Sequence, residues 1–221
     1  MLQPLKKIPG VINRDMRLFE KEFNDALYSK VRLIQTVSRF LIKQKGKRIR
    51  PMLTILSARM CGEPTDNSYK AAAMIELLHI ATLIHDDVVD GAVRRRGWLS
   101  INRIWGNKLA VLLGDYVLSK SLIYMIKLKD FDVLEIISKT AELMSSGEIL
   151  QLDQRFKKYP TEDIYFDLIR QKTASLIATG CELGALTTSR SAQDCKSMSS
   201  YGYNLGMAYQ IRDDLFDLLG N

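Results

Sequence analysis

The stretch from Tyr69 to Asp90 constrains the fold more than any other feature, because it is apolar on nearly every face of a helix. A helix that is hydrophobic all round must be covered by other elements. The sequence therefore predicts a central buried helix with further helices around it. Its small and aliphatic residues are Ala71, Ala72, Ala73, Met74, Ile75, Leu77, Leu78, Ile80, Ala81, Leu83 and Ile84.

The remainder of the chain also has the pattern of helices, and no stretch alternates as a strand would. Pro51, Pro64 and Pro160 stand beside glycine or polar clusters, and none interrupts an apolar-periodic stretch. We find no repeat, linker or charge block that divides the chain, so the pattern predicts a single all-α domain over residues 1–221. The predicted helices span about 12–28, 31–44, 51–61, 67–90, 107–128, 132–157, 161–189 and 194–219.

Composition excludes several classes of protein. With 221 residues, 47% of them hydrophobic, the chain can bury one sizeable core. The net charge of +7 favours an anionic partner without naming it. Cys61, Cys181 and Cys195 are widely spaced, which predicts reduced thiols rather than disulfides or a zinc site. Charges interrupt every apolar run and no targeting signal is evident, so we expect a cytoplasmic protein with at most peripheral membrane contact.

Two aspartate-rich motifs are the strongest chemical signal: HDDVVD at 85–90 closes the central helix, and DDLFD stands at 213–217. Asp86 and Asp90 lie one helical turn apart on one face, ~6 Å along the axis, which suits oxygen ligands of a divalent cation such as Mg²⁺. One copy is typical of a solvated helix end. Two copies after apolar helices favour a shared metal cluster that bridges to phosphate oxygens.

Basic residues cluster in GKRIRP at 46–51 and in RRRG at 94–97. The planar fork of arginine suits phosphate, so these clusters beside carboxylates indicate a phosphorylated ligand; a solvated or nucleic-acid-binding patch is the alternative. His79 lies on the same helical stripe as Asp86 and Asp90, which favours a phosphate contact over a core histidine. Lys172, Thr173 and Gln210 are weaker signals, and by themselves they fit surface residues or interhelical hydrogen bonds better than a binding site.

The chain has two histidines, and it has no GxSxG, no Cys/His pairing and no glycine-rich dinucleotide loop. Acyl transfer and hydride transfer are therefore poorly supported. A reaction driven by electrostatics fits better, in which metal ions and cationic side chains stabilise negative charge on a departing phosphate group.

Taken in order, these motifs resemble those of the trans-polyprenyl diphosphate synthases, in particular the long-chain, octaprenyl- or solanesyl-like members. The match runs over about residues 40–220 and includes GKRIRP, ELLHIATLIHDDVVDGAVRRRG, WGNKLAVLLGDYVLS, GEILQL, KTASLIATGCELGA and GMAYQIRDDLFD. The resemblance implies an all-α isoprenoid-synthase bundle, usually a homodimer, in which the two aspartate motifs face each other across a central cavity.

The resemblance also implies the reaction and its residues. Mg²⁺ helps an allylic diphosphate to ionise, and the double bond of isopentenyl diphosphate attacks the carbocation. The implied catalytic residues are Asp86, Asp87, Asp90, Asp213, Asp214 and Asp217, of which Asp86, Asp90, Asp213 and Asp217 foremost hold the metal. The implied isopentenyl diphosphate site is Lys47, Arg50, His79 and Arg96. The implied allylic diphosphate site is Arg95, Lys172, Thr173 and Gln210.

Product length in this family depends largely on bulk just upstream of the first aspartate motif, where short-chain members tend to carry an aromatic residue. This chain has Ala81 and Thr82 there. Small side chains leave the cavity floor open, so we expect a long-chain product, on the order of C30 to C50. The stop is then expected from bulk on the following helix, at Tyr124 or Met125.

The chain departs from the family pattern in two places. Trp98-Leu99-Ser100 stands where Lys-Pro-Thr or Lys-Ala-Thr is usual. The family also continues well past the second aspartate motif, with a lysine that helps bind the allylic diphosphate. A fragment, a naturally short variant and a chain completed by a partner all fit, so a partner-dependent or non-catalytic subunit of a heteromeric synthase is the alternative. A nucleic-acid binder is disfavoured, because the acidic motifs would repel phosphates without a metal.

Overall fold

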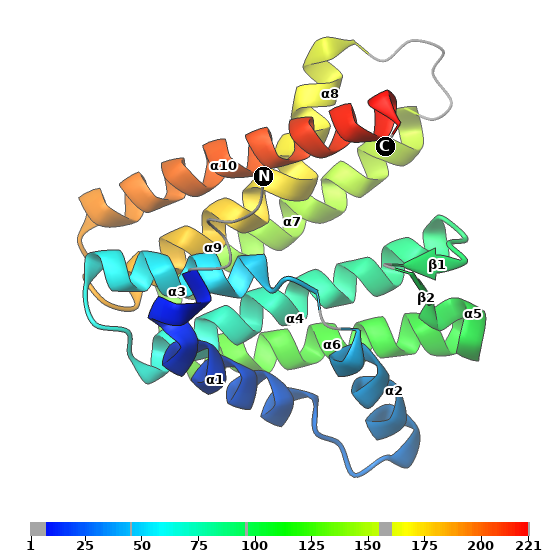
Figure 1. The fold of residues 1–221 in the computed structure, drawn as a ribbon, viewed down its shortest axis with the longest axis horizontal. Helices are drawn as coiled ribbons and strands as arrows, with labels where there is room; N and C mark the ends of the chain where they lie inside the picture. The colour runs from blue at the N-terminus through cyan, green and yellow to red at the C-terminus, as the bar shows by residue number, and fades with distance from the viewer. Residues whose placement is uncertain (1–7, 45, 96, 155–160, 221) are drawn as a thin grey trace.

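The computed structural model describes residues 8–44, 46–95, 97–154 and 161–220, and it confirms the predicted all-α class. Helix α4 (Asp66–Val89) runs through the middle of the molecule, as its apolar pattern predicts (Figure 1). It begins at a capping box in which the Thr65 and Ser68 side chains accept each other's backbone N–H groups. Its side chains are buried around most of its circumference, so it is the axis of the core.

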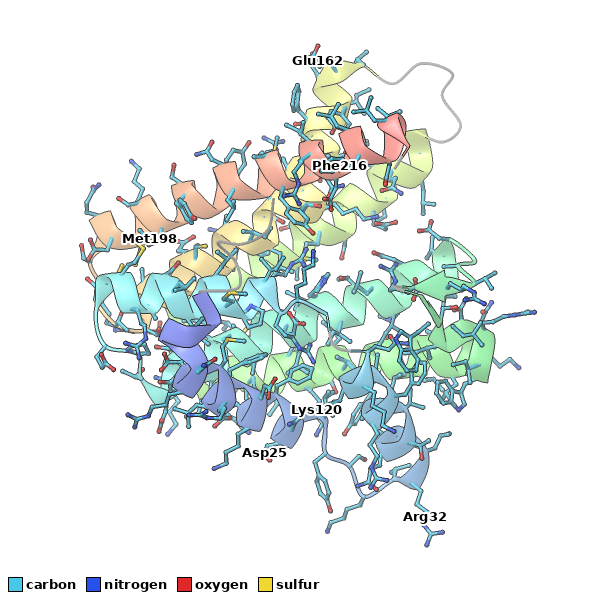
Figure 2. The ribbon with its side chains drawn as sticks, viewed as in Figure 1. Asp25, Arg32, Lys120, Glu162, Met198 and Phe216 are labelled. Carbon is cyan, nitrogen blue, oxygen red and sulfur yellow. The ribbon has the colours of Figure 1, made fainter. Side chains whose placement is uncertain are left out.

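Other helices cover α4. Helices α1 (Ile8–Leu27), α3 (Ile49–Cys61), α6 (Asn107–Lys127) and α9 (Ser175–Leu186) pack against it. A second layer follows, in which α10 (Ala192–Leu219) packs on α9, and α7 (Phe131–Gln154) contacts α9 (Figure 1). Helix α2 (Arg32–Lys43) lies against α6 and projects outward, with Arg32 at its outer end (Figure 2). The core therefore lies between α1, α3, α4, α6 and α9.

Two glycines let the helices around α9 approach closely. A Cβ added at Gly184 would lie 2.2 Å from the Thr54 carbonyl oxygen of α3. One added at Gly206 of α10 would lie 2.6 Å from the Ala174 Cα. Any larger residue would push these helices apart, and with them the segments that contribute to the cavity described below.

The predicted helix over 161–189 is divided in the structure. Helix α8 (Glu162–Ile169) leads into a π-helical turn, η2 (Arg170–Ala174), before α9 begins. The Ser175 N–H donates to the Arg170 carbonyl, five residues back. Such turns interrupt a helix locally and are frequent at functional sites. The π-helical turn could not be predicted from the hydrophobic pattern, because the segments before and after it are both helical and the pattern continues through it.

A small hairpin and a short helix follow α4, where we predicted no strand. Strands β1 (Arg94–Arg95) and β2 (Trp98–Leu99) pair antiparallel, with Arg94 opposite Leu99. Gly97 has φ +82°, a conformation that glycine adopts at little cost. Helix α5 (Ile101–Trp105) comes next. The prediction was wrong here because two-residue strands and a five-residue helix are too short to show a period.

Helix α6 is, within the described ranges, the one helix long and apolar enough to cross a membrane by length and composition. The sequence prediction counted single charges such as Asp115 as interruptions and saw no such run. In the structure 39% of its most apolar window is buried, and the helix packs against α4 through Ala110, Leu113 and Val117. Its remaining apolar face is exposed.

Candidate active site

A central cavity of about 400 Å³ opens between α3, α4, α7, η2 and α10. It collects most of the residues that the sequence predicted for the two diphosphate sites, from segments far apart in the chain. Arg50 comes from α3, His79 and Asp86 from α4, Lys172 and Thr173 from η2, and Gln210 from α10. The cavity is lined by Arg50, His79, Thr82, Leu83, His85, Asp86, Val89, Met144, Ser145, Glu148, Ile149, Lys172, Thr173 and Gln210.

A second hollow, which we call the basic hollow, adjoins the central cavity. It has a volume of about 390 Å³ and is lined by Gly46, Lys47, Arg48, Ile49, Arg50, Glu76, His79 and Tyr209. Arg50 and His79 line both spaces, and Arg50 Nη1 lies 3.0 Å from His79 Nε2. Lys47 is exposed at this hollow. Three residues predicted for one ligand therefore surround one space.

The acidic side of the central cavity contains a carboxylate that the sequence analysis missed. Burial, together with the negative charge of Glu148 on α7, raises the pKa of Asp86 to about 6. Lys172 Nζ lies 2.5 Å from Glu148 Oε2 and donates to Gln151 Oε1 at 3.0 Å. The other oxygen of Glu148 is buried without a hydrogen-bond partner among the described residues. Glu148 and Gln151, the two polar residues of GEILQL, were the sequence signal that could have indicated this part of the site.

Asp87 turns away from the central cavity and is paired with Arg95 of β1. Arg95 Nε donates to Asp87 Oδ1 at 2.6 Å. Burial raises the pKa of Asp87 and Arg95 opposes that rise. Both residues line a small hollow of about 40 Å³ beside the basic hollow, together with His79. Arg95 was predicted to meet the allylic diphosphate, and in this structure it lies at that small hollow. Arg96, predicted for the isopentenyl diphosphate site, lies outside the described residues.

The second aspartate motif connects to the cavity through a chain of hydrogen bonds. The Thr173 hydroxyl donates to Gln210 Oε1 at 2.8 Å, and Gln210 Nε2 donates to Asp214 Oδ1 at 2.9 Å. The Tyr165 hydroxyl donates to Asp214 Oδ2 at 2.7 Å, and burial and this bond raise the pKa of Tyr165 to about 12. These bonds hold Asp214 in place beside the cavity. Asp213 instead accepts a bond from Arg212 at 3.3 Å.

The aspartates are not brought together around a single point. Asp90, Asp213, Asp214 and Asp217 do not line the central cavity, and no three carboxylate, imidazole or thiol groups of the described residues gather closely enough to hold a metal ion. Mg²⁺, however, is usually held by one or two carboxylates with waters and substrate phosphates. Asp86 and the unpartnered oxygen of Glu148 leave negative charge in the cavity, which fits a hydrated divalent cation.

The residues predicted to set product length divide between cavity wall and core. Thr82 lines the cavity, and its hydroxyl donates to the His79 carbonyl at 2.9 Å. Ala81 is buried beside it. Tyr124 and Met125 are buried on α6 and do not line the cavity as the structure describes it. The Tyr124 hydroxyl donates to the Glu22 carbonyl of α1 at 2.8 Å.

A helical bundle whose central cavity combines a half-buried aspartate with arginine, lysine and histidine defines a protein suited to anionic ligands. The polyprenyl synthetase family matches residues 31–221, and the chain belongs to this family. The resemblance inferred from the ordered motifs, and the isoprenoid-synthase type of fold with it, are thereby confirmed.

Three relatives illustrate the similarity. The octaprenyl diphosphate synthase of Escherichia coli (strain K12) is 35% identical over 213 residues, which cover 96% of this chain and 66% of the relative. Heptaprenyl diphosphate synthase component 2 of Bacillus subtilis is 36% identical over 207 residues, covering 93% of this chain and 59% of the relative. The crystal structure of a polyprenyl synthase from Caulobacter crescentus, complexed with calcium and isoprenyl diphosphate, superposes with a TM-score of 0.93 at 34% identity, over 98% of this chain and 66% of that one. This chain thus spans less than two thirds of the length of these relatives.

Proposed function

We propose that the protein is a trans-prenyltransferase that condenses isopentenyl diphosphate with an allylic diphosphate and extends it to a long-chain polyprenyl diphosphate. The observation that carries the proposal is the central cavity, where Asp86 shares one space with Arg50 and Lys172. The C. crescentus relative, whose structure is described as a complex with calcium and isoprenyl diphosphate, supports it. We propose that residues 1–221 act as one catalytic domain.

In this proposal the two diphosphates occupy the two adjoining spaces. Lys47, Arg50 and His79 bind the diphosphate of isopentenyl diphosphate at the basic hollow, and the family resemblance assigns Arg96 to the same ligand. Thr173 and Gln210 orient the allylic diphosphate in the central cavity, and Arg95 contributes from the hairpin. Lys172 is paired with Glu148 in this structure, so it has to exchange that partner for a phosphate oxygen when the allylic substrate binds.

Asp86 and Asp90 on one side, and Asp213 and Asp217 on the other, would hold Mg²⁺, with the two remaining aspartates fixed by their own partners. Asp87 is held by Arg95, and Asp214 by Tyr165 and Gln210. When bound, Mg²⁺ supplies positive charge that stabilises the departing diphosphate. The allylic C–O bond then breaks, the alkene carbon of isopentenyl diphosphate bonds to the allylic carbon, and one proton is lost.

The wall of the cavity is the basis for proposing a long-chain product. Thr82 and its apolar neighbours Leu83, Met144 and Ile149 line the space, and no phenylalanine, tyrosine or tryptophan stands among the lining residues that the structure describes. A growing hydrocarbon chain would bury its surface against these side chains. Ala81 and Thr82 leave room where an aromatic residue would close it.

Two assemblies are compatible with this function, and we favour a homodimer through α6. Large apolar residues of this helix are exposed, with Leu112 64% and Ile126 69% accessible. Large apolar residues gathered on one exposed helix are typical of an interaction site. A hetero-oligomer is the second candidate, because two similar relatives are named heptaprenyl diphosphate synthase component 2. In either case we place the protein in the cytoplasm, with at most peripheral contact with a membrane.

The test is an elongation assay with purified protein, Mg²⁺, isopentenyl diphosphate and an allylic primer, followed by product mass. We expect a long-chain product, loss of turnover in excess chelator, and a loss of at least about 100-fold in Asp86→Ala. Glu142→Ala, on the exposed face of α7, is the matched control and should retain activity. A product ending at C15 or C20 would contradict the long-chain assignment. Turnover that appears only with an added subunit would favour the hetero-oligomer.

A further inference from the structure

We infer that the largely buried ion pair between Arg48 and Glu76 is a positioning device, which holds the segment from Lys47 to Arg50, where a loop enters α3, in the conformation that binds the diphosphate of isopentenyl diphosphate. The inference rests on the proposed function and deepens it. Neither residue belongs to the predicted diphosphate contacts. Both line the basic hollow, between the residues that do.

The backbone of this loop is held in an unfavourable conformation. Arg48 has φ +50° and ψ +37°, the left-handed region that residues with a Cβ rarely adopt. It stands directly before α3, with Lys47 on one side and Arg50 two residues later. Such a conformation persists only where the surroundings stabilise it, so something must hold Arg48.

The side chain of Arg48 provides that restraint. Its Nη1 lies 2.6 Å from Glu76 Oε1 of α4, and its guanidinium carbon lies 4.4 Å from the centre of the Phe23 ring of α1. The side chains of Arg48 and Glu76 are only 13% and 6% exposed, and Phe23 is buried. A charge-assisted bond that is shielded from water and backed by an aromatic ring is strong and directional. Arg48 is thus fixed against two helices.

A second contact, between Arg50 and His79, holds the same segment one turn further along α4. Glu76 and His79 are three residues apart, so they share a face of the helix, and Arg50 lies 3.0 Å from His79. Arg48 and Arg50 are therefore each held by one of two neighbouring side chains. Lys47, which precedes Arg48, is directed by the same backbone. Release of Arg48 would let Lys47 and Arg50 move relative to each other and lose their common ligand.

The test is calorimetric titration of the purified protein with isopentenyl diphosphate, in the presence of Mg²⁺ and without primer, so that no turnover occurs. Glu76→Gln removes a negative charge from the wall of the hollow and leaves Arg48 charged. If charge alone mattered, the anion would bind more tightly. Positioning predicts the opposite, an affinity about tenfold weaker or more, with Glu76→Asp intermediate. Binding by Glu76→Gln that equals or exceeds that of the unsubstituted protein overturns the inference.

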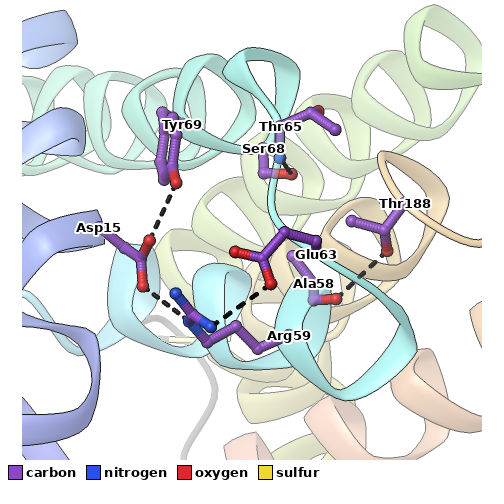
Figure 3. Close-up of polar contacts among 8 residues, drawn as sticks. All are labelled: Asp15, Ala58, Arg59, Glu63, Thr65, Ser68, Tyr69 and Thr188. Atoms are coloured by element: carbon purple, nitrogen blue, oxygen red, sulfur yellow. Dashed lines mark hydrogen bonds and ion pairs between the residues drawn. The ribbon is translucent and has the colours of Figure 1, made fainter.

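Two further variants separate positioning from loss of folding. The double variant R48G/E76Q removes both charges and places glycine where φ is positive, so it should fold and still bind weakly. Asp15→Asn is the matched control: Asp15 is buried on α1, and Arg59 of α3 donates to it at 2.7 Å, away from the hollow (Figure 3). It should lower the melting temperature and leave affinity unchanged.

The outcomes distinguish this inference from the proposed function. Equal weakening in Asp15→Asn and Glu76→Gln would show an effect of general stability and overturn the positioning role. Tight binding by R48G/E76Q would do the same. If the unsubstituted protein does not bind isopentenyl diphosphate at all, the proposed function fails and the inference fails with it.

Discussion

Asp86 shows at the scale of one residue how a functional charge opposes stability. Its carboxyl group shares the central cavity with Glu148, and burial raises its pKa to about 6. The positive charges of Lys172 and Arg95 lower this pKa, and the negative charge of Asp90 raises it further. The pKa of Asp86 remains raised overall. The folded protein therefore holds a proton on Asp86 at pH values where the unfolded chain has lost it, and ionisation above that range costs stability.

This argument predicts that Asp86→Asn stabilises the ligand-free protein at pH 7, by about 1 kcal/mol after allowance for solvent screening. The gain should be present at pH values above about 6 and disappear as pH falls below 3.8, because Asp86 is then protonated in both the folded and the unfolded protein. Urea unfolding at pH 7 and at a pH below 3.8 measures it. Asp25→Asn, on an exposed position of α1, is the control (Figure 2). A variant that is less stable at pH 7 would refute the argument.

Residue-level prediction succeeded in part where it followed a single helix. The stripe of His79, Asp86 and Asp90 on α4 was readable from their spacing; His79 and Asp86 line the central cavity, and Asp90 does not. The like-charged neighbour of Asp86 could not be predicted from the sequence. Glu148 lies on another helix, and its approach to Asp86 depends on how α7 packs, which no local spacing encodes.

At the scale of elements, glycines at the contacts between helices determine how closely the helices that form the cavity wall can pack together. Gly184 meets the Thr54 carbonyl oxygen, and Gly206 meets Ala174 at the end of the π-helical turn. The same contacts place η2, and hence Lys172 and Thr173, next to α10. The close packing of α9 and its neighbours therefore sets the arrangement of the cavity wall and also stabilises the fold.

We predict that Gly184→Ala destabilises the fold by about 1–3 kcal/mol, because the new Cβ would lie 2.2 Å from a backbone oxygen, and relieving that overlap requires the backbone of α3 or α9 to shift. Thermal or urea unfolding measures the loss. Ser200→Ala on the exposed face of α10 serves as control and should change stability by less than about 0.5 kcal/mol. Equal stability of Gly184→Ala and the parent protein would show that α3 and α9 can separate freely.

At the scale of the whole molecule, the exposed apolar residues are unevenly distributed. Helix α6 presents Val111, Leu112, Leu122, Ile123 and Ile126, and a groove of about 180 Å³ between α2 and α6 continues this surface. The opposite face of α6 is buried on α4. Helix α6 packs directly against α4, the helix that carries Asp86. A second copy bound to the exposed face of α6 would therefore stabilise the position of α4.

The proposed homodimer predicts that a charge on this face separates the subunits. Leu112→Glu should shift the mass in solution from dimer to monomer, because an unpaired carboxylate would be buried in an apolar interface. Analytical ultracentrifugation measures the change. Leu218→Glu introduces the same charge at an 82% exposed position of α10, and it should leave the mass as it was. A parent protein that is monomeric at micromolar concentration would exclude the homodimer.

The sequence by itself determined the helical class, the central helix and the family, because these depend on apolar periodicity and on motifs that lie within single helices. Through their resemblance to the family motifs, it also identified several of the side chains that line the central cavity, among them Arg50, Asp86 and Lys172. Tertiary structure alone decided the hairpin, the π-helical turn, the pairing of Asp87 with Arg95 and the approach of Glu148 to Asp86. These features arise where segments distant in the chain meet, and such contacts are set by packing and burial rather than by local pattern.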